Sequence, residues 1–233
     1  VTAFAAGVDG QQCPKGKLRF YTSWPMQGAM LPEGTGMKNG VELAVKEINA
    51  AGGILGRKIV LDNADTQSNP ALAKALTVKA IDDDTYVVMG PVFSGSIIVS
   101  MAETRRAEVP NFTGGEAAAI TLQGNPYVFR TSFSQATGMP KIANYIASGL
   151  KAKTVVVMFV NNDFGKGGRD QIIKEFGTRN IKVVADISTD PAQVDFSSPV
   201  LRAKQANADA LFAYLNEEES ARLLRELRKQ GYD

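Results

Sequence analysis

The spacing of apolar, β-branched runs in the last third of the chain most restricts the fold. Residues 153–160 form an almost wholly apolar run, the kind that is buried on both faces of a parallel sheet. Strands expected to begin at Thr154, Ile181 and Ala210 start 27 and 29 residues apart, which matches a strand–helix–strand unit of about 30 residues. The sequence therefore predicts an α/β protein built on parallel sheets.

The same alternation of strand and helix patterns runs through the rest of the chain. The expected strands are 18–23, 58–63, 86–89, 109–113, 127–131, 153–160, 181–186 and 210–214. The expected helices are 41–50, 70–84, 94–107, 136–149, 166–176, 196–206 and 217–229. A glycine-rich loop up to Gly36 is expected before the first helix, and Pro70 suits the start of the second.

A polar stretch at 132–135 is the expected boundary between two sheets. It predicts a first lobe over 18–137 and a second over 138–233, after a leader or disordered N-terminus at 1–17. The second lobe would hold only three strands, fewer than the usual four to six, and the chain stops just after a helix. We therefore expect the second lobe to be incomplete and the sequence to lack its C-terminal part.

Composition excludes several kinds of site. The chain has no histidine and one cysteine, Cys13, so Ser-His-Asp triads, Cys-His dyads and histidine zinc sites are excluded. The glycines at 165–168 resemble a dinucleotide loop, but Asp170 stands where its third glycine should be. The net charge is only +2, without a long like-charge run, which argues against nucleic-acid or membrane-surface binding. We expect no catalytic residue, no metal and no cofactor.

The stretch 86–96 reads as a strand, a turn and a helix with Ser94 or Ser96 as its N-cap. First-turn amides at Gly95 and Ser96, a serine hydroxyl and the positive end of the helix dipole would together suit a carboxylate. The alternative is an ordinary helix cap that binds only water.

Ligands of open parallel sheets bind at the carboxyl ends of the strands. Here those ends carry hydroxyls, amides, aromatics and carboxylates, and few of the cations that a phosphate would need. They include Trp24, Asp65, Thr66, Thr113, Glu116, Asn162, Asp163, Phe164 and Asn216. Trp24 reads more readily as a packed aromatic than as a ligand shelf. The run Glu217-Glu218-Glu219, with Arg222 and Arg225, reads as a solvated helix face.

Residues 41–59, VELAVKEINAAGGILGRKI, resemble the signature of type I periplasmic binding proteins. The resemblance is to the leucine/isoleucine/valine-binding branch, which supplies ABC importers. Residues 65–70, 90–96 and 162–165 agree with it in order and spacing, and the match covers about 18–233. It implies two Rossmann-like lobes with parallel sheets that are joined by a hinge and close on a solute. It also implies a further C-terminal segment.

The resemblance assigns the ligand carboxylate to Ser94, a backbone contact to Gly115 and the second-lobe aromatic to Phe164. The threonine expected beside Gly115 is replaced by Glu116 or Ala117, and Glu33 takes the place of an aromatic before the first helix. The family's acidic residue for the ligand ammonium would lie beyond residue 233, and Glu116 is a candidate replacement. The expected ligand site is Ser94, Gly95, Ser96, Gly115, Glu116, Ala117, Phe164, Trp24 and Asn216.

These features predict a monomeric, periplasmic or extracellular solute-binding protein, with or without a membrane anchor. It would bind an amino acid of the branched-chain type or a related small carboxylate, and deliver it to an ABC transporter permease. The same fold could instead take an aromatic acid, an amide or urea. An enzyme on a doubly wound sheet is a different alternative. A sugar-type transcriptional regulator is another, but only 17 residues precede the first expected strand, too few for a DNA-binding headpiece.

Overall fold

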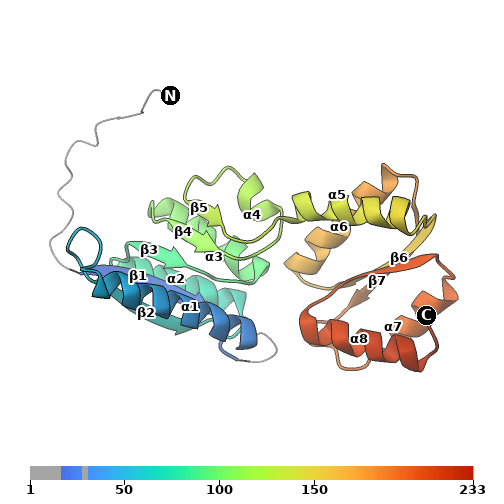
Figure 1. Ribbon diagram of the computed structural model, residues 1–233, viewed down its shortest axis with the longest axis horizontal. Helices are drawn as coiled ribbons and strands as arrows, with labels where there is room; N and C mark the ends of the chain where they lie inside the picture. The colour runs from blue at the N-terminus through green and yellow to red at the C-terminus, as the bar shows by residue number, and fades with distance from the viewer. Residues whose placement is uncertain (1–16, 28–30, 233) are drawn as a thin grey trace.

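The computed structural model describes residues 17–27 and 31–232, and its strands form two separate sheets (Figure 1). The strand orders are β2-β1-β3-β4-β5 and β7-β6-β8, and every pairing is parallel. The parallel α/β class expected from the sequence is therefore confirmed. Cys13 and nearly all of the expected leader lie outside the described residues.

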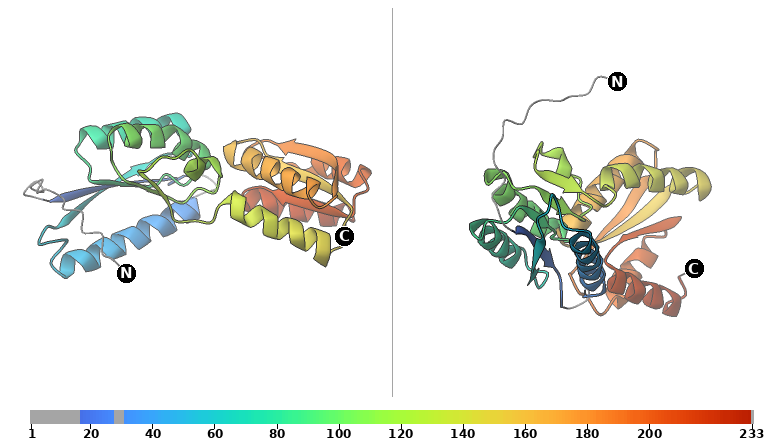
Figure 2. Two further views of the ribbon diagram at one scale, coloured as in Figure 1. Left: turned by 90° about the horizontal axis from the view of Figure 1, so that it is seen from above. Right: turned by 60° about the vertical axis from the view of Figure 1, so that its left-hand side comes forward.

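The first lobe contains five strands and four helices. Its strands are β1 (Leu18–Trp24), β2 (Ile59–Asp65), β3 (Val87–Met89), β4 (Asn111–Thr113) and β5 (Val128–Arg130). Its helices are α1 (Leu31–Ala50), α2 (Pro70–Asp82), α3 (Ser94–Arg106) and α4 (Ala119–Leu122). Helices α2 and α3 cover one face of the sheet and α1 lies along the other (Figure 2).

The second lobe is built around β6. Its strands are β6 (Thr154–Val160), β7 (Lys182–Thr189) and β8 (Ala210–Tyr214). Its helices are α5 (Gln135–Asn144), the π-helical turn η2 (Tyr145–Gly149), α6 (Asp163–Gly177), α7 (Ser197–Gln205) and α8 (Glu217–Lys229). In Figure 1, α5 and α6 lie on one side of this sheet and α7 and α8 on the other.

Both faces of β6 are buried, as its apolar sequence predicts. Val155 and Val157 pack with α5, η2 and α6, whereas Val156, Met158 and Val160 pack with α7 and α8. Alternate residues of a strand point to opposite faces, so a central strand with helices on both sides needs apolar residues throughout.

Helix α1 starts earlier than the sequence indicates. It begins at Leu31, so the part of the expected glycine-rich loop from there to Gly36 is helical. Gly34 serves close packing, because a Cβ there would lie 2.0 Å from the carbonyl oxygen of Pro25. The short helix α4 was not expected at all.

The chain order within each sheet marks the strand ends at which a ligand crevice is expected. The first sheet grows from β1 to β2 on one side and then from β3 onward on the other, which makes β1 and β3 a topological switch point. The second sheet grows around β6 in the same manner.

In the described chain, a single connection, residues 131–134, joins β5 to α5. No described helix has the length and apolar composition needed to cross a bilayer.

Candidate functional site

Two adjoining cavities lie between the lobes. One has a volume of about 640 Å³ and the other about 220 Å³, and residues of both lobes line each of them. They share Phe93 and Ser94 from the first lobe and Phe164 and Asn216 from the second. We call them together the interlobe cleft.

The cleft collects most of the expected ligand residues. Those that line it are Ser94, Gly95, Ser96, Gly115, Glu116, Phe164 and Asn216. Ala117 is buried behind them, and its N–H donates to Ser94 Oγ at 3.2 Å. Trp24 is only 5% exposed, lies against Gly90 and lines neither cavity, so it is a packed aromatic of the first lobe.

Ser94 is the first residue of α3 rather than its cap. The N-cap is Phe93, which makes no side-chain cap hydrogen bond, so the expectation of a serine cap at Ser94 or Ser96 is wrong. Because Ser94 Oγ accepts from Ala117, its own proton is left to donate to a group in the cleft. Ser96 Oγ is also buried, and it has no partner.

Phe164 is positioned by the start of α6. Asn162 caps that helix, because its Oδ1 accepts the Gly165 N–H at 2.9 Å. Phe164 therefore lies in the first turn, where its ring faces the cleft and stacks on Tyr214 with centroids 4.2 Å apart. Gly165 is required here: a Cβ would lie 1.8 Å from the carbonyl oxygen of Val160.

A chain of hydrogen bonds crosses between the lobes beside the cleft. Tyr214 donates its hydroxyl to Glu116 Oε2 at 2.6 Å. Gln135 donates its backbone N–H to the Glu116 carbonyl at 3.0 Å, and its Nε2 to the Phe164 carbonyl at 2.8 Å and to the Tyr214 hydroxyl at 3.2 Å. Tyr214 and Gln135 thus hold both Glu116 and Phe164, one from each lobe.

Burial raises the pKa of Glu116 above its usual value, and the charge of Glu217 adds to this rise. The hydrogen bond from Tyr214 and the charge of Arg130 partly oppose it. Arg130 donates to the carbonyls of Gly115 and Ala117, so it braces the loop on which Glu116 stands.

The ligand site expected from the sequence did not include the other acidic residues of the cleft. Glu33, Asp163, Glu217 and Glu219 also line it. Glu219 is only 3% exposed and accepts from the backbone N–H groups of Asn216 and Ala192, so reading it as part of a solvated face was wrong. The Asn-x-x-Glu spacing from Asn216 to Glu219 is a capping-box pattern that could have revealed this.

Tyr214→Phe should lower the stability of the protein by about 1.5 kcal/mol near neutral pH, because a hydrogen bond to a charged group is lost. The loss should also raise the pKa of Glu116 further. A carboxyl group whose pKa is raised in the folded state destabilises the fold as pH rises through that pKa. The stability difference between Tyr214→Phe and the unchanged protein should therefore become smaller as the pH is lowered. Urea denaturation across pH would measure it. The exposed Tyr145→Phe is the control, and an equal, pH-independent deficit in both variants would contradict the assignment.

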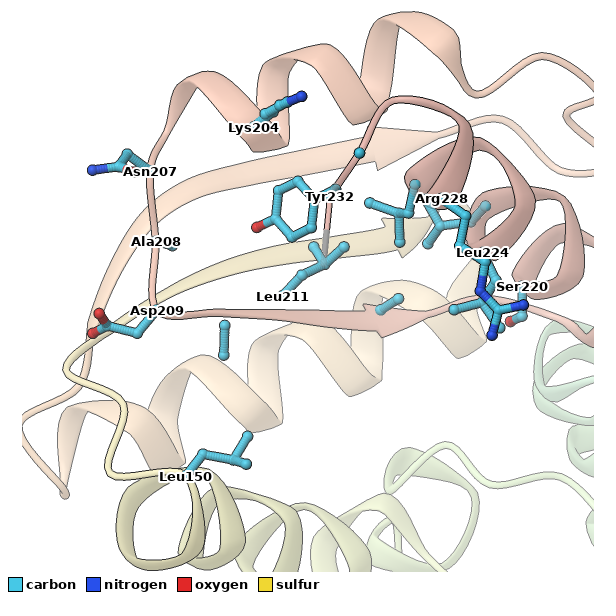
Figure 3. A pocket seen from close by; sticks show the side chains of 15 residues that line it. Leu150, Lys204, Asn207, Ala208, Asp209, Leu211, Ser220, Leu224, Arg228 and Tyr232 are labelled. Atoms are coloured by element: carbon cyan, nitrogen blue, oxygen red, sulfur yellow. The ribbon is translucent and has the colours of Figure 1, made fainter.

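A separate cavity of about 880 Å³ runs along β8 in the second lobe (Figure 3). Its walls include Leu211, Leu224 and Tyr232, and β8 has only β6 as a neighbour in the described sheet. None of the expected ligand residues reaches it, so the interlobe cleft is the candidate site.

Comparison with known proteins agrees with this architecture. The family described as "Periplasmic binding protein" matches residues 22–233. The chain belongs to the type I periplasmic binding protein family. The resemblance seen in the sequence is thereby confirmed, including two Rossmann-like lobes joined by a hinge.

Two similar proteins are named for branched-chain amino acids. The Leu/Ile/Val-binding protein BraC3 of Rhizobium johnstonii is 30% identical over 81% of this chain and 52% of its own length. The branched-chain amino acid transporter substrate-binding protein LivJ of Streptococcus pneumoniae, solved with isoleucine, is 28% identical with a TM-score of 0.82, over 93% of this chain and 62% of its own.

A third relative has the same fold and a different ligand. The solute-binding protein of an ABC transporter from Rhodopseudomonas palustris BisB5, in complex with 3,4-dihydroxybenzoic acid, is 22% identical with a TM-score of 0.82. The alignment covers 92% of this chain and 59% of that one. The chain therefore spans between half and two thirds of the length of these relatives.

Proposed function

We propose that the protein is the extracytoplasmic solute-binding component of an ABC importer. It binds an amino acid or a related small carboxylate in the interlobe cleft and presents it to the permease. It works as a monomer in the periplasm or outside the cell, with or without a membrane anchor, and it needs neither a cofactor nor catalytic chemistry.

One observation carries this proposal. The Ser94 hydroxyl and the first turn of α3 on one lobe face Phe164 and Asn216 on the other across a single cleft. The hydroxyl and the helix N-terminus suit a carboxylate, and the ring of Phe164 offers an apolar surface. The ligands named for BraC3 and LivJ have this combination of groups.

The lobe boundary expected between 137 and 138 falls inside α5; we place it in the connection 131–134 instead, and we propose that the lobes close on the solute. The ligand contacts are proposed at Ser94, Gly95, Ser96, Gly115 and Glu116, with Phe164 and Asn216 opposite. An aromatic acid is the second candidate, since the ring of Phe164 could stack on one and Ser94 could hold its carboxylate.

A ligand screen tests the function. Thermal shift over branched-chain amino acids, basic amino acids, hydroxybenzoates, amides and urea should identify one class that stabilises the protein. A ligand at 100 times its Kd adds about 2.7 kcal/mol of stability. Isothermal titration of the best compound should give one site per chain. If no compound of any class binds, the proposal is contradicted.

A further inference from the structure

The walls of the interlobe cleft are strongly acidic. Among the described residues, five carboxylate side chains line its two cavities, and no lysine or arginine does. They are Glu33, Glu116, Asp163, Glu217 and Glu219. None of the five makes an ion pair with a described residue, although ten such pairs are found elsewhere in the protein.

Three of these carboxylates converge on the smaller cavity, of about 220 Å³. Glu116 stands on the loop after β4, Glu217 on the first turn of α8, and Glu33 on the first turn of α1. Glu33 Oε2 is buried there without a hydrogen-bond partner. The hydrogen bond from Tyr214 reaches only Oε2 of Glu116, which leaves Oε1 for a ligand.

Arg130, whose positive charge acts on Glu116, does not neutralise the three carboxylates of the smaller cavity. The guanidinium of Arg130 donates to the carbonyls of Gly115 and Ala117 and to Thr121 Oγ1, behind the loop that carries Glu116. The pKa of Glu116 stays raised in spite of Arg130, through burial first and then the charge of Glu217. Like charges around a partly buried cavity stabilise a cation placed between them.

The larger cavity shows an independent sign of a ligand. Ser96 Oγ is fully buried, has no partner and lines this cavity, and Ser94 has a proton to donate beside it. A carboxylate bound there would lie near Asp163, because a Cβ on Gly95 would be only 2.6 Å from Asp163 Oδ2. A ligand that brought only negative charge would therefore be repelled, and one with compensating positive charge would not.

We propose that the solute is an amino acid with a cationic side chain. Its carboxylate lies on Ser94, Ser96 and the first turn of α3, and its α-ammonium faces Glu116. The side-chain ammonium or guanidinium enters the smaller cavity between Glu33 and Glu217. This inference rests on the proposed function, since it specifies the solute class for the same cleft.

Titration calorimetry with arginine, lysine, leucine and 4-hydroxybenzoate tests this assignment. Arginine or lysine should bind at least roughly 10-fold more tightly than leucine, and 4-hydroxybenzoate should not bind. Affinity for arginine should also fall as pH drops through the raised pKa of Glu116, because a protonated Glu116 no longer attracts a cation. Glu33, Glu217, Arg130 and Tyr214 are the charged and titratable groups around it.

Matched variants locate the cationic group. Glu217→Gln should weaken the affinity for arginine roughly 10-fold or more and change the affinity for leucine by no more than about 2-fold. Glu218→Gln, one residue further along α8 and paired with Arg222 outside the cleft, should change neither. An unchanged melting temperature would show that Glu217→Gln still folds. The preference for arginine over leucine should also be lost in Glu33→Gln.

The outcomes separate the two proposals. Leucine binding as tightly as arginine, tight 4-hydroxybenzoate binding, or equal losses for both amino acids in Glu217→Gln would overturn the cationic solute and keep the solute-binding function. No binding of any of the four probes would overturn the cationic solute, and no binding of any compound of the ligand screen would overturn both.

Discussion

The Gly165→Ala variant is expected to lose at least about 3 kcal/mol of folding stability. The added Cβ would lie 1.8 Å from the carbonyl oxygen of Val160, and this atom cannot move aside cheaply. Val160 ends β6, the strand that is buried between helices on both faces. The first turn of α6 would have to shift instead, and Phe164 would move with it.

A second glycine of α6 provides the control. Gly177 is the last residue of the same helix, and a Cβ there would meet nothing within 4 Å. Gly177→Ala should therefore be neutral or gain up to about 1 kcal/mol, because alanine loses less conformational entropy in a helix. Urea denaturation of both variants measures the difference. Similar stabilities for the two would mean that the close approach of Gly165 to Val160 is wrong.

Ser94→Ala is expected to weaken binding of the solute by roughly 10- to 150-fold, the equivalent of about 1.5–3 kcal/mol for a hydroxyl bonded to a charge. The donor to the ligand carboxylate is lost, and the Ala117 amide loses its acceptor at the same time. Isothermal titration with the best compound of the ligand screen measures the effect.

Ser100→Ala is the matched control for this variant. Ser100 lies in the same helix and is equally buried, but its hydroxyl has no partner and lines neither part of the cleft. Its removal should leave affinity unchanged and should not reduce stability. If Ser94→Ala also kept full affinity, Ser94 would be only a support for the Ala117 amide.

Regular hydrophobic patterns predicted the second lobe closely. Strand β8 and helix α8 have the expected bounds, and β6 differs by one residue. The pattern failed where glycine had a packing role. Gly34 and Gly36 looked like loop residues, yet both lie inside α1, and Gly34 is there because Pro25 passes too close for a side chain. Such a contact between distant segments leaves no signal in the local sequence that would distinguish a helical glycine from a loop glycine.

The rule that ligands bind at strand ends predicted much of the cleft. Ser94, Glu116 and Phe164 come from different strand ends, and the fold brings them to one place. Trp24 also follows this rule, but the side chain turns into the core. The convergence of the acidic residues was not predicted, because Glu33 and Glu217 are ordinary first-turn residues of their helices and only the packing of two lobes makes them neighbours of Glu116.

In the lobe closure that we propose, Gln135 lies at the pivot between the lobes. Its backbone is bonded to Glu116 in the first lobe and its side chain to Phe164 in the second, at the point where residues 131–134 cross. Rotation about this point moves each strand in proportion to its distance from the axis. Strand β2 lies four strands from β5, about 19 Å away. In that proposed closure we expect the loop after β2, with Gln67, and the start of α2 at Pro70 to make the largest excursion, and the solute to enter and leave on that side of the cleft.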